Sequence, residues 1–224
     1  MARLNLFGII ATGVLFIAPP SCLSAARVHS HSGTLLVSLF NDAGAPQSVL
    51  QRAEDRAAEI FAAAGIEVHW ILCVPEPAQF DAGPDTPSCA SFTNPSHLSV
   101  RIVPPASTLG KDVFGQAILD KSGHGVYAKV YYSTRFAYVS EELLDEGAML
   151  GYVIAHEVGH LLLGVNSHSA EGLMCAHWRR EELRHASLNF LFFTSKDAAN
   201  LRSRFAAAEY ARGECDTIRN PSCK

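Results

Sequence analysis

The sequence has little excess charge, no low-complexity segment and no internal repeat. Its 224 residues carry a formal net charge of −4, and 18% of them are charged while 48% are hydrophobic. The lack of a basic surplus and of long runs of like charge argues against nucleic acid as a partner. The composition is typical of a globular chain, and the length suits one domain of moderate size.

Long hydrophobic runs are also missing, apart from one near the N-terminus. Residues 1–26 contain a short basic start at Arg3, an apolar run over 6–18, two prolines and then small residues. This order is typical of a secretory signal peptide. The apolar run is shorter than the roughly 20 residues that a membrane-spanning helix needs. We therefore expect residues 27–224 to form a single exported domain, secreted or periplasmic, that is monomeric and without stable membrane insertion.

Cysteine is scarce, because the chain has only six, five of which follow residue 26. Export makes these five candidates for disulfide bonds. Cys73 and Cys89 flank a proline-rich segment, and Cys215 and Cys223 bracket the C-terminal tail. We predict one disulfide in each of these pairs, which leaves Cys175 as a free thiol.

Hydrophobic periodicity predicts five strands and three helices, which together make an α/β fold. The strands are expected over 34–40, 66–73, 97–103, 113–119 and 125–133, and the helices over 48–64, 142–163 and 195–212. Ser48 and Gln51 are predicted to form a capping box, and Gly65 to end the first helix. The first strand, helix and strand predict a right-handed crossover within a parallel sheet.

The predicted helix over 142–163 carries the pattern His-Glu-x-x-His at His156, Glu157 and His160. Residues four apart lie on one face of a helix, so both imidazoles can point at one metal ion. Zinc lowers the pKa of a bound water toward about 7, and the adjacent Glu157 can take that proton and later deliver it to a leaving amine. The surrounding residues are strongly apolar. A metal is favoured because burying these polar groups without a partner would be costly.

A third metal ligand is expected after Gly164, where a glycine permits positive φ and a sharp change of direction. Three downstream side chains are candidates, namely His168, Glu171 and His177. We favour His168, because it follows soon after the turn and offers the nitrogen that zinc prefers. Glu171 and His177 remain the alternatives.

With these residues, the segment HEVGHLLLGVNSHSAEGLM resembles the metzincin metallopeptidases, especially their matrixin-like branch. The matching residues are the zinc ligands His156, His160 and His168, Ser169 directly after the third ligand, the general base Glu157, the helix-ending Gly164, and Met174, which forms a hydrophobic floor under the zinc. The resemblance implies a zincin-type α/β domain, whose five-stranded mixed sheet has a backing helix, an active-site helix and a C-terminal helix. It implies an endopeptidase with one catalytic zinc ion and a peptide or protein substrate. It also implies that the substrate pairs with an edge strand, here 113–119, where Gly115 would allow close approach.

The spacing departs from that family at two places. Three residues instead of two separate His160 from Gly164, and three instead of two separate Gly164 from His168. No tyrosine follows Met174. His177 stands near that place, either as a stabiliser of the oxyanion or as an ordinary hydrogen-bonded surface histidine.

Two other functions are compatible with the sequence. A non-catalytic, zinc-stapled binding domain would use the same histidines. However, a structural zinc site usually has a closed fourth position and needs no base such as Glu157. A secreted binding protein without a metal would instead use the proline-rich segment or the C-terminal tail as its contact surface. The sequence favours the zinc-dependent endopeptidase.

Overall fold

The computed structural model describes residues 34–73, 89, 97–105, 113–132 and 145–218, with side chains described up to residue 210. All of these belong to one compact unit, His31–Lys224. The predicted signal peptide over 1–26 and the predicted Cys215–Cys223 disulfide fall outside what the structure describes, so both stay predictions.

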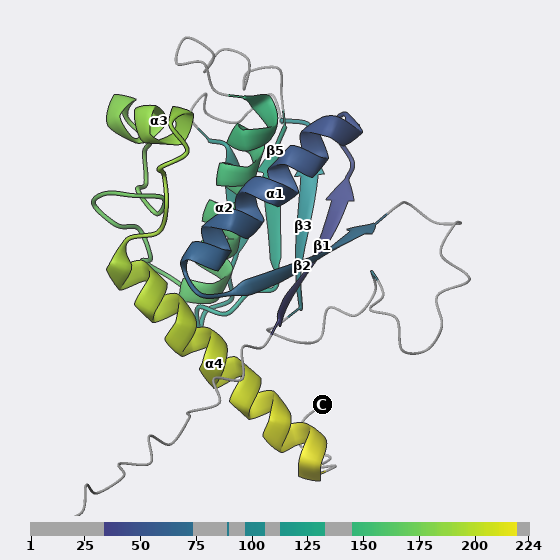
Figure 1. Cartoon of the computed structure of the whole chain (residues 1–224). Coiled ribbons are helices and arrows are strands. Elements are labelled where there is room, and N and C mark those ends of the chain that lie inside the picture. Colours follow the sequence, from purple (N-terminus) through teal and green to yellow (C-terminus); the bar gives the residue numbers. More distant parts are fainter. Residues whose placement is uncertain (1–33, 74–88, 90–96, 106–112, 133–144, 219–224) are drawn as a thin grey trace, which may run out of the picture. The chain divides into compact units, whose positions relative to one another are not determined.

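Five strands form one mixed sheet in the order β2-β1-β3-β5-β4 (Figure 1). Their bounds are β1 Thr34–Asn41, β2 Glu67–Cys73, β3 His97–Val103, β4 Gly115–Ile118 and β5 Tyr127–Tyr131. β1 pairs in parallel with β2 and β3, and β3 in parallel with β5, whereas β4 runs antiparallel to β5 at the edge of the sheet. The predicted strands and the parallel β1–β2 pair are therefore confirmed.

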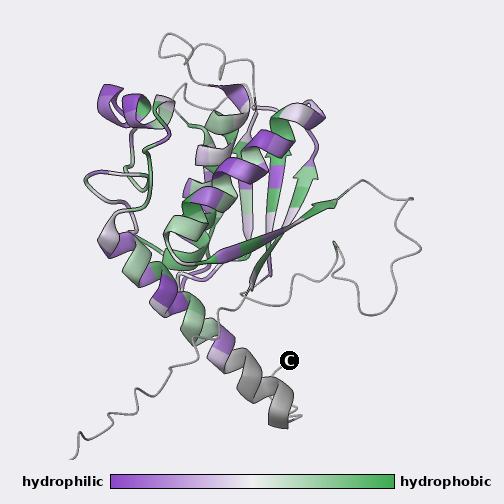
Figure 2. Cartoon of the chain, viewed as in Figure 1, coloured by the Kyte–Doolittle hydropathy of each residue, from purple (hydrophilic) through white to green (hydrophobic). Residues whose placement is uncertain are grey.

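Within the described residues, four helices accompany the sheet, namely α1 Gln47–Ala63, α2 Glu146–Leu163, α3 Arg180–Ser187 and α4 Ser195–Ile218. Figure 1 shows α1 and α2 packed side by side over one face of the sheet, with the first turns of α4 against α2. In Figure 2, α1 has a hydrophilic outer side, whereas α2 is hydrophobic along most of its length. α2 is thus a buried helix, and any polar group on it needs a partner.

The first two helices end as predicted, at Gly65 and Gly164, but their N-terminal ends differ from the prediction. α1 begins directly after Pro46, so Ser48 lies inside the first turn and the capping box with Gln51 does not form. Gln51 donates instead to Asp55 over 3.1 Å. α2 begins four residues later than predicted, because Asp145 is in an extended conformation and its carboxylate accepts the backbone N–H of Ala148 at 3.0 Å.

Two further differences concern the C-terminal part of the chain. α4 continues through Gly213, which does not take the positive φ by which a glycine ends a helix. The sequence prediction missed α3, because its eight residues include only two buried ones and show no apolar stripe. Its charges do carry a signal, since Glu181 and Glu182 lie in the first turn and Arg184 in the last.

Small residues on α2 let its neighbours approach closely. A Cβ atom on Gly151 would lie 2.6 Å from the carbonyl oxygen of Ala53 in α1. A Cβ atom on Gly159 would lie 2.7 Å from Sδ of Met174. These contacts fix the position of α2 between α1 and the loop that follows it. The predicted helix is thereby held at the centre of the core.

The predicted disulfide between Cys73 and Cys89 is present, with a Cα–Cα distance of 5.8 Å. It ties the end of β2 to the segment before β3. Cys175 is a free cysteine, as expected, but it is partly exposed, whereas a buried thiol was expected. Within the described part of the chain, no helix has both the length and the hydrophobicity needed to cross a membrane.

Gly164 ends α2 with φ 81° and ψ −161°, a combination that is nearly restricted to glycine. A Cβ atom there would also lie 2.9 Å from the carbonyl oxygen of Gly123. We expect Gly164→Ala to lower the free energy of unfolding by ~3 kcal/mol, measured by chemical denaturation. Gly44→Ala is the matched control, because Gly44 has φ 69° but nothing within 4 Å of its Cβ position, and should cost ~1 kcal/mol. Equal losses at the two sites would contradict this interpretation.

Candidate metal centre

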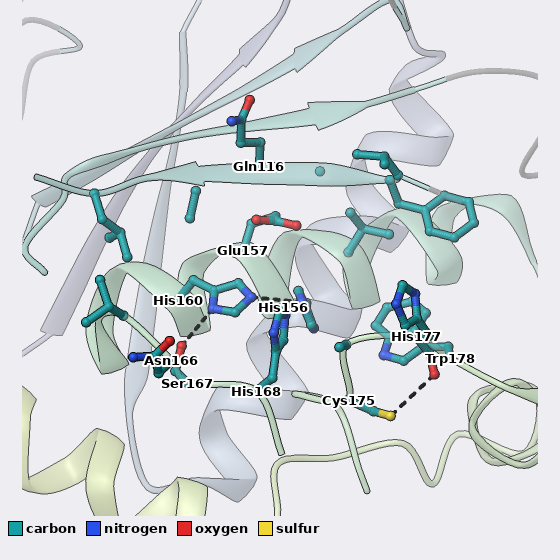
Figure 3. A pocket seen from close by; sticks show the side chains of 18 of the residues that line it. Gln116, His156, Glu157, His160, Asn166, Ser167, His168, Cys175, His177 and Trp178 are labelled. Carbon is teal, nitrogen blue, oxygen red and sulfur yellow. Dashed lines mark hydrogen bonds between the residues drawn. The ribbon is translucent and has the colours of Figure 1, made fainter. Parts of the chain in front are cut away.

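Three histidines from two segments converge on one cavity of about 760 Å³ (Figure 3). His156 and His160 lie one turn apart on α2, and His168 lies in the loop that follows α2. One nitrogen from each ring lies within 4.8 Å of the others, and the Nε2 atoms of His156 and His160 are 3.0 Å apart. Nitrogen ligands of a tetrahedral zinc ion are separated by about 3.3 Å. The spacing of the three side chains therefore fits one metal ion.

The Nδ1 atoms of the two helix histidines, His156 and His160, take part in hydrogen bonds. Nδ1 of His156 lies 2.8 Å from the carbonyl oxygen of Leu173, which can only accept. Nδ1 therefore carries the proton, and Nε2 presents a lone pair to the cavity. Nδ1 of His160 lies 2.7 Å from the hydroxyl oxygen of Ser167. Partners of this kind orient metal-binding histidines and set their tautomer.

The electrostatics of the site favour the neutral form of all three rings. Burial lowers the pKa of His156 to about 4. Burial, together with His156 and His168, lowers the pKa of His160 to about 3. The pKa of His168 is also lowered, by burial and by His177 nearby. Neutral imidazole is the form that binds a metal ion, so the residues present fit zinc.

Two residues with positive φ return the chain to the metal centre. Gly164 ends α2, and Asn166 has φ 56°, which asparagine adopts more readily than most other residues. The chain thus changes direction twice within three residues. As a result, His168 lies against the last turns of the helix that it has just left, with its ring centroid 4.6 Å from that of His160.

The loop is then fixed on the far side of His168. The backbone N–H of Ser169 donates to the carbonyl of Met174 over 2.8 Å, and the Ser169 hydroxyl donates to Asp197 over 2.8 Å. Asp197 is buried in the first turn of α4, where its second oxygen accepts from the hydroxyl of Thr194 at 2.7 Å. The position of His168 therefore depends on the start of α4 as well as on its own loop.

The structure brings His168, but neither of the two other candidates for the third ligand, into one group with His156 and His160. Among the described residues, the group that could hold a metal ion consists of His156, His160 and His168. Glu171 and His177 are not part of it, although His177 lines the same cavity. In Figure 3 the sulfur atom of Cys175 points away from the three histidines; its thiol donates to the carbonyl of His177 at 3.3 Å.

Glu157 lies between the histidines and strand β4 (Figure 3). Its side chain is buried, with 6% of the residue exposed, and its carboxylate accepts the backbone N–H of Ala117. Burial raises the pKa of Glu157 to about 8, while the hydrogen bond from Ala117 acts in the opposite direction. A cation held by the histidines would also lower it.

Gly115 makes room for this carboxylate. A Cβ atom on Gly115 would lie 2.5 Å from Oε1 of Glu157 and 2.5 Å from its Cγ. From the sequence, the missing side chain of Gly115 was expected to allow a substrate close to the strand. In the structure, Glu157 fills that space instead.

Met174 lies beneath the site, with none of its surface exposed, and its sulfur atom packs against Gly159. Sequence reasoning matched Ser169 to the metzincin pattern but did not find the hydrogen bonds around the centre, whose other members are Ser167, Asp197 and the carbonyl of Leu173. Apart from the position of Ser167 and Ser169 on either side of His168, the sequence carries no signal for them.

No protein-family model matches this sequence, and no curated protein matches it either. Among solved structures, the fold is similar to that of a zinc-dependent peptidase from Methanocorpusculum labreanum (strain Z), with 16% sequence identity and a TM-score of 0.47. The similar region covers 74% of this chain and 99% of that one.

Proposed function

We propose that this chain is a zinc-dependent endopeptidase of the metzincin type. The observation that carries the proposal is one cavity in which three neutral histidines converge beside a buried glutamate. His156, His160 and His168 would hold one zinc ion. Zinc bound there supplies a Lewis acid that activates water and polarises the carbonyl of a peptide bond.

Glu157 is the general base in this proposal. Its carboxylate takes a proton from the attacking water and passes it to the amine that leaves. The hydrogen bond from Ala117 and the close packing at Gly115 hold the carboxylate in one orientation. A zinc ion that only stabilised the fold would need neither a base nor an open cavity, and this favours catalysis over the zinc-stapled binding domain.

Strand β4 is the proposed docking edge for a peptide substrate. It is an edge strand of the sheet, and three of its residues, Gly115, Gln116 and Ala117, line the cavity that contains the histidines. An extended peptide can add to such an edge through backbone hydrogen bonds. The disulfide between Cys73 and Cys89 fits the oxidising compartment that a signal peptide over 1–26 would lead to. We accordingly propose a secreted or periplasmic, monomeric enzyme.

The test combines metal content with hydrolysis. Protein purified from zinc-containing medium should carry one zinc ion per chain and cleave a casein-like substrate, lose activity with a chelator and regain it with added zinc. One zinc ion per chain without cleavage would instead indicate the stapled binding domain. Protein that binds no zinc would indicate the binding protein without a metal.

Gly115→Ala should slow hydrolysis by about 100-fold without loss of zinc. The new Cβ atom would displace the Glu157 carboxylate, and a displacement of about 1 Å at a catalytic group has an effect of this order. Rates on a casein-like substrate and zinc content would be measured together. Gly44→Ala is the control, because it makes the same change at a glycine that has nothing within 4 Å of its Cβ position and does not line the cavity. Equal rates for the two variants would contradict the proposed role of Gly115.

A further inference from the structure

The three-residue gap between Gly164 and His168 places a hydroxyl group behind one of the histidines. Gly164 and Asn166 turn the chain, and Ser167 then lies back over the end of α2. Its Oγ atom is 2.7 Å from Nδ1 of His160 (Figure 3). Both nitrogens of His160 are thereby in contact, one with Ser167 and the other with His156.

The partner of His160 differs chemically from the partner of His156. The carbonyl of Leu173 can only accept a hydrogen bond, so it holds His156 in one tautomer. The hydroxyl of Ser167 can either donate or accept, so it can serve either tautomer of His160.

His160 needs one tautomer when no cation is bound and the other tautomer when a cation is bound. The Nε2 atom of His156 presents a lone pair, and Nε2 of His160 lies only 3.0 Å from it. Either His160 carries a proton on Nε2, in which case Ser167 donates to Nδ1, or a cation lies between the nitrogens and Nδ1–H donates to Ser167. In both cases the ring keeps the same orientation, because Oγ of Ser167 stays in place and only its hydrogen rotates.

We propose that Ser167 is a positioning residue, which holds the imidazole of His160 in the metal-binding orientation before and after zinc binds. This inference rests on the proposed zinc site and names a residue that the general His-Glu-x-x-His pattern does not contain. Loss of a hydrogen-bonding partner of a metal ligand typically weakens metal binding by about 10-fold to 100-fold.

The loop does not depend on this hydroxyl for its path. Its turns are made by the backbone of Gly164 and Asn166, and its far end is fixed by the hydrogen bonds of Ser169 to Met174 and Asp197. A change at Ser167 can therefore remove the contact with His160 while the loop keeps its conformation.

The experiment compares Ser167→Thr with Ser167→Val, two side chains of the same shape of which only threonine has a hydroxyl. The zinc dissociation constant is measured by competition with a chromophoric chelator. We expect valine to weaken zinc binding by about 10-fold to 100-fold, and threonine to stay within about 3-fold of the wild type. Ser203→Ala is the control, because Ser203 is an exposed serine that lines the neighbouring polar cavity. It should bind zinc like the wild type.

A second measurement separates positioning from a general effect on the fold. Thermal unfolding of the zinc-free valine variant should stay close to that of the threonine variant, since only one hydrogen bond is lost, while ¹⁵N-histidine spectra should show the Nδ1 proton of His160 exchanging faster with solvent in the zinc-loaded valine variant. Equal zinc affinity of the valine and threonine variants would overturn the inference. If the wild type binds zinc but cleaves no peptide, the proposed function fails, and the comparison of the two variants still decides the role of Ser167.

Discussion

Glu157→Gln is expected to abolish peptide hydrolysis, with a loss of about 1,000-fold, and to leave zinc bound. An amide has the shape of the carboxylate and can still accept the N–H of Ala117, but it cannot take a proton from water. General acid–base groups contribute about 100-fold to 10,000-fold to a rate, which sets the size of the effect. Initial rates on a casein-like substrate and the zinc content of the same samples would be measured.

The variant should also be well folded. Burial raises the pKa of Glu157, which means that the neutral form suits this environment better than the charged one. Folding of the variant with a neutral glutamine therefore does not require a charge to be buried. Glu171→Gln, an exposed glutamate in the loop after α2, is the control and should keep its activity. A Glu157→Gln enzyme that cleaves at the wild-type rate would show that the proposed mechanism is wrong.

His168→Ala should weaken zinc binding by more than the roughly 100-fold that loss of an outer hydrogen-bonding partner can cost, because it removes a ligand itself. We expect a loss of about 1,000-fold and no measurable hydrolysis. Chelator competition gives the affinity. The result tests directly whether a loop with three residues between Gly164 and His168, instead of the usual two, can return His168 to the two helix histidines.

Glu171→Ala and His177→Ala are the matched variants, because these residues are the two other candidates for the third ligand. Both should bind zinc with wild-type affinity, since neither belongs to the group of side chains that could hold the ion. Loss of zinc in either of them, with zinc retained in His168→Ala, would assign the third position to that residue instead.

Local sequence patterns were sufficient for most of the fold, because buried strands and helices leave apolar runs and periodicity. β3 has the predicted bounds, and α1 differs from its prediction by one residue at each end. The start of α2 depends on the conformation of Asp145, and the short α3 is held by contacts between segments, such as the hydrogen bond from the hydroxyl of Tyr152 to the carbonyl of Ala186. Such contacts leave no local pattern.

The same distinction applies to the metal centre. The positions of His156, Glu157 and His160 relative to one another follow from the geometry of one helix. The return of His168 depends on the positive φ of Asn166 and on a hydrogen bond to Asp197, which lies 28 residues after Ser169. The contact between Glu157 and β4 depends on a strand some 40 residues earlier in the chain. Neither the return of His168 nor the contact of Glu157 with β4 could be predicted from a local sequence motif.

Asp197 has a consequence for where the domain that holds the candidate metal centre ends. The sheet, α1 and all three histidines precede Ser195, so a shortened chain that stopped there would keep every residue of the motif. It would nevertheless lose the carboxylate that accepts from Ser169, and with it a restraint on the residue next to His168. The opening turn of α4 is therefore part of the structural unit that forms the candidate metal centre, and the smallest fragment suitable for recombinant expression has to extend beyond it.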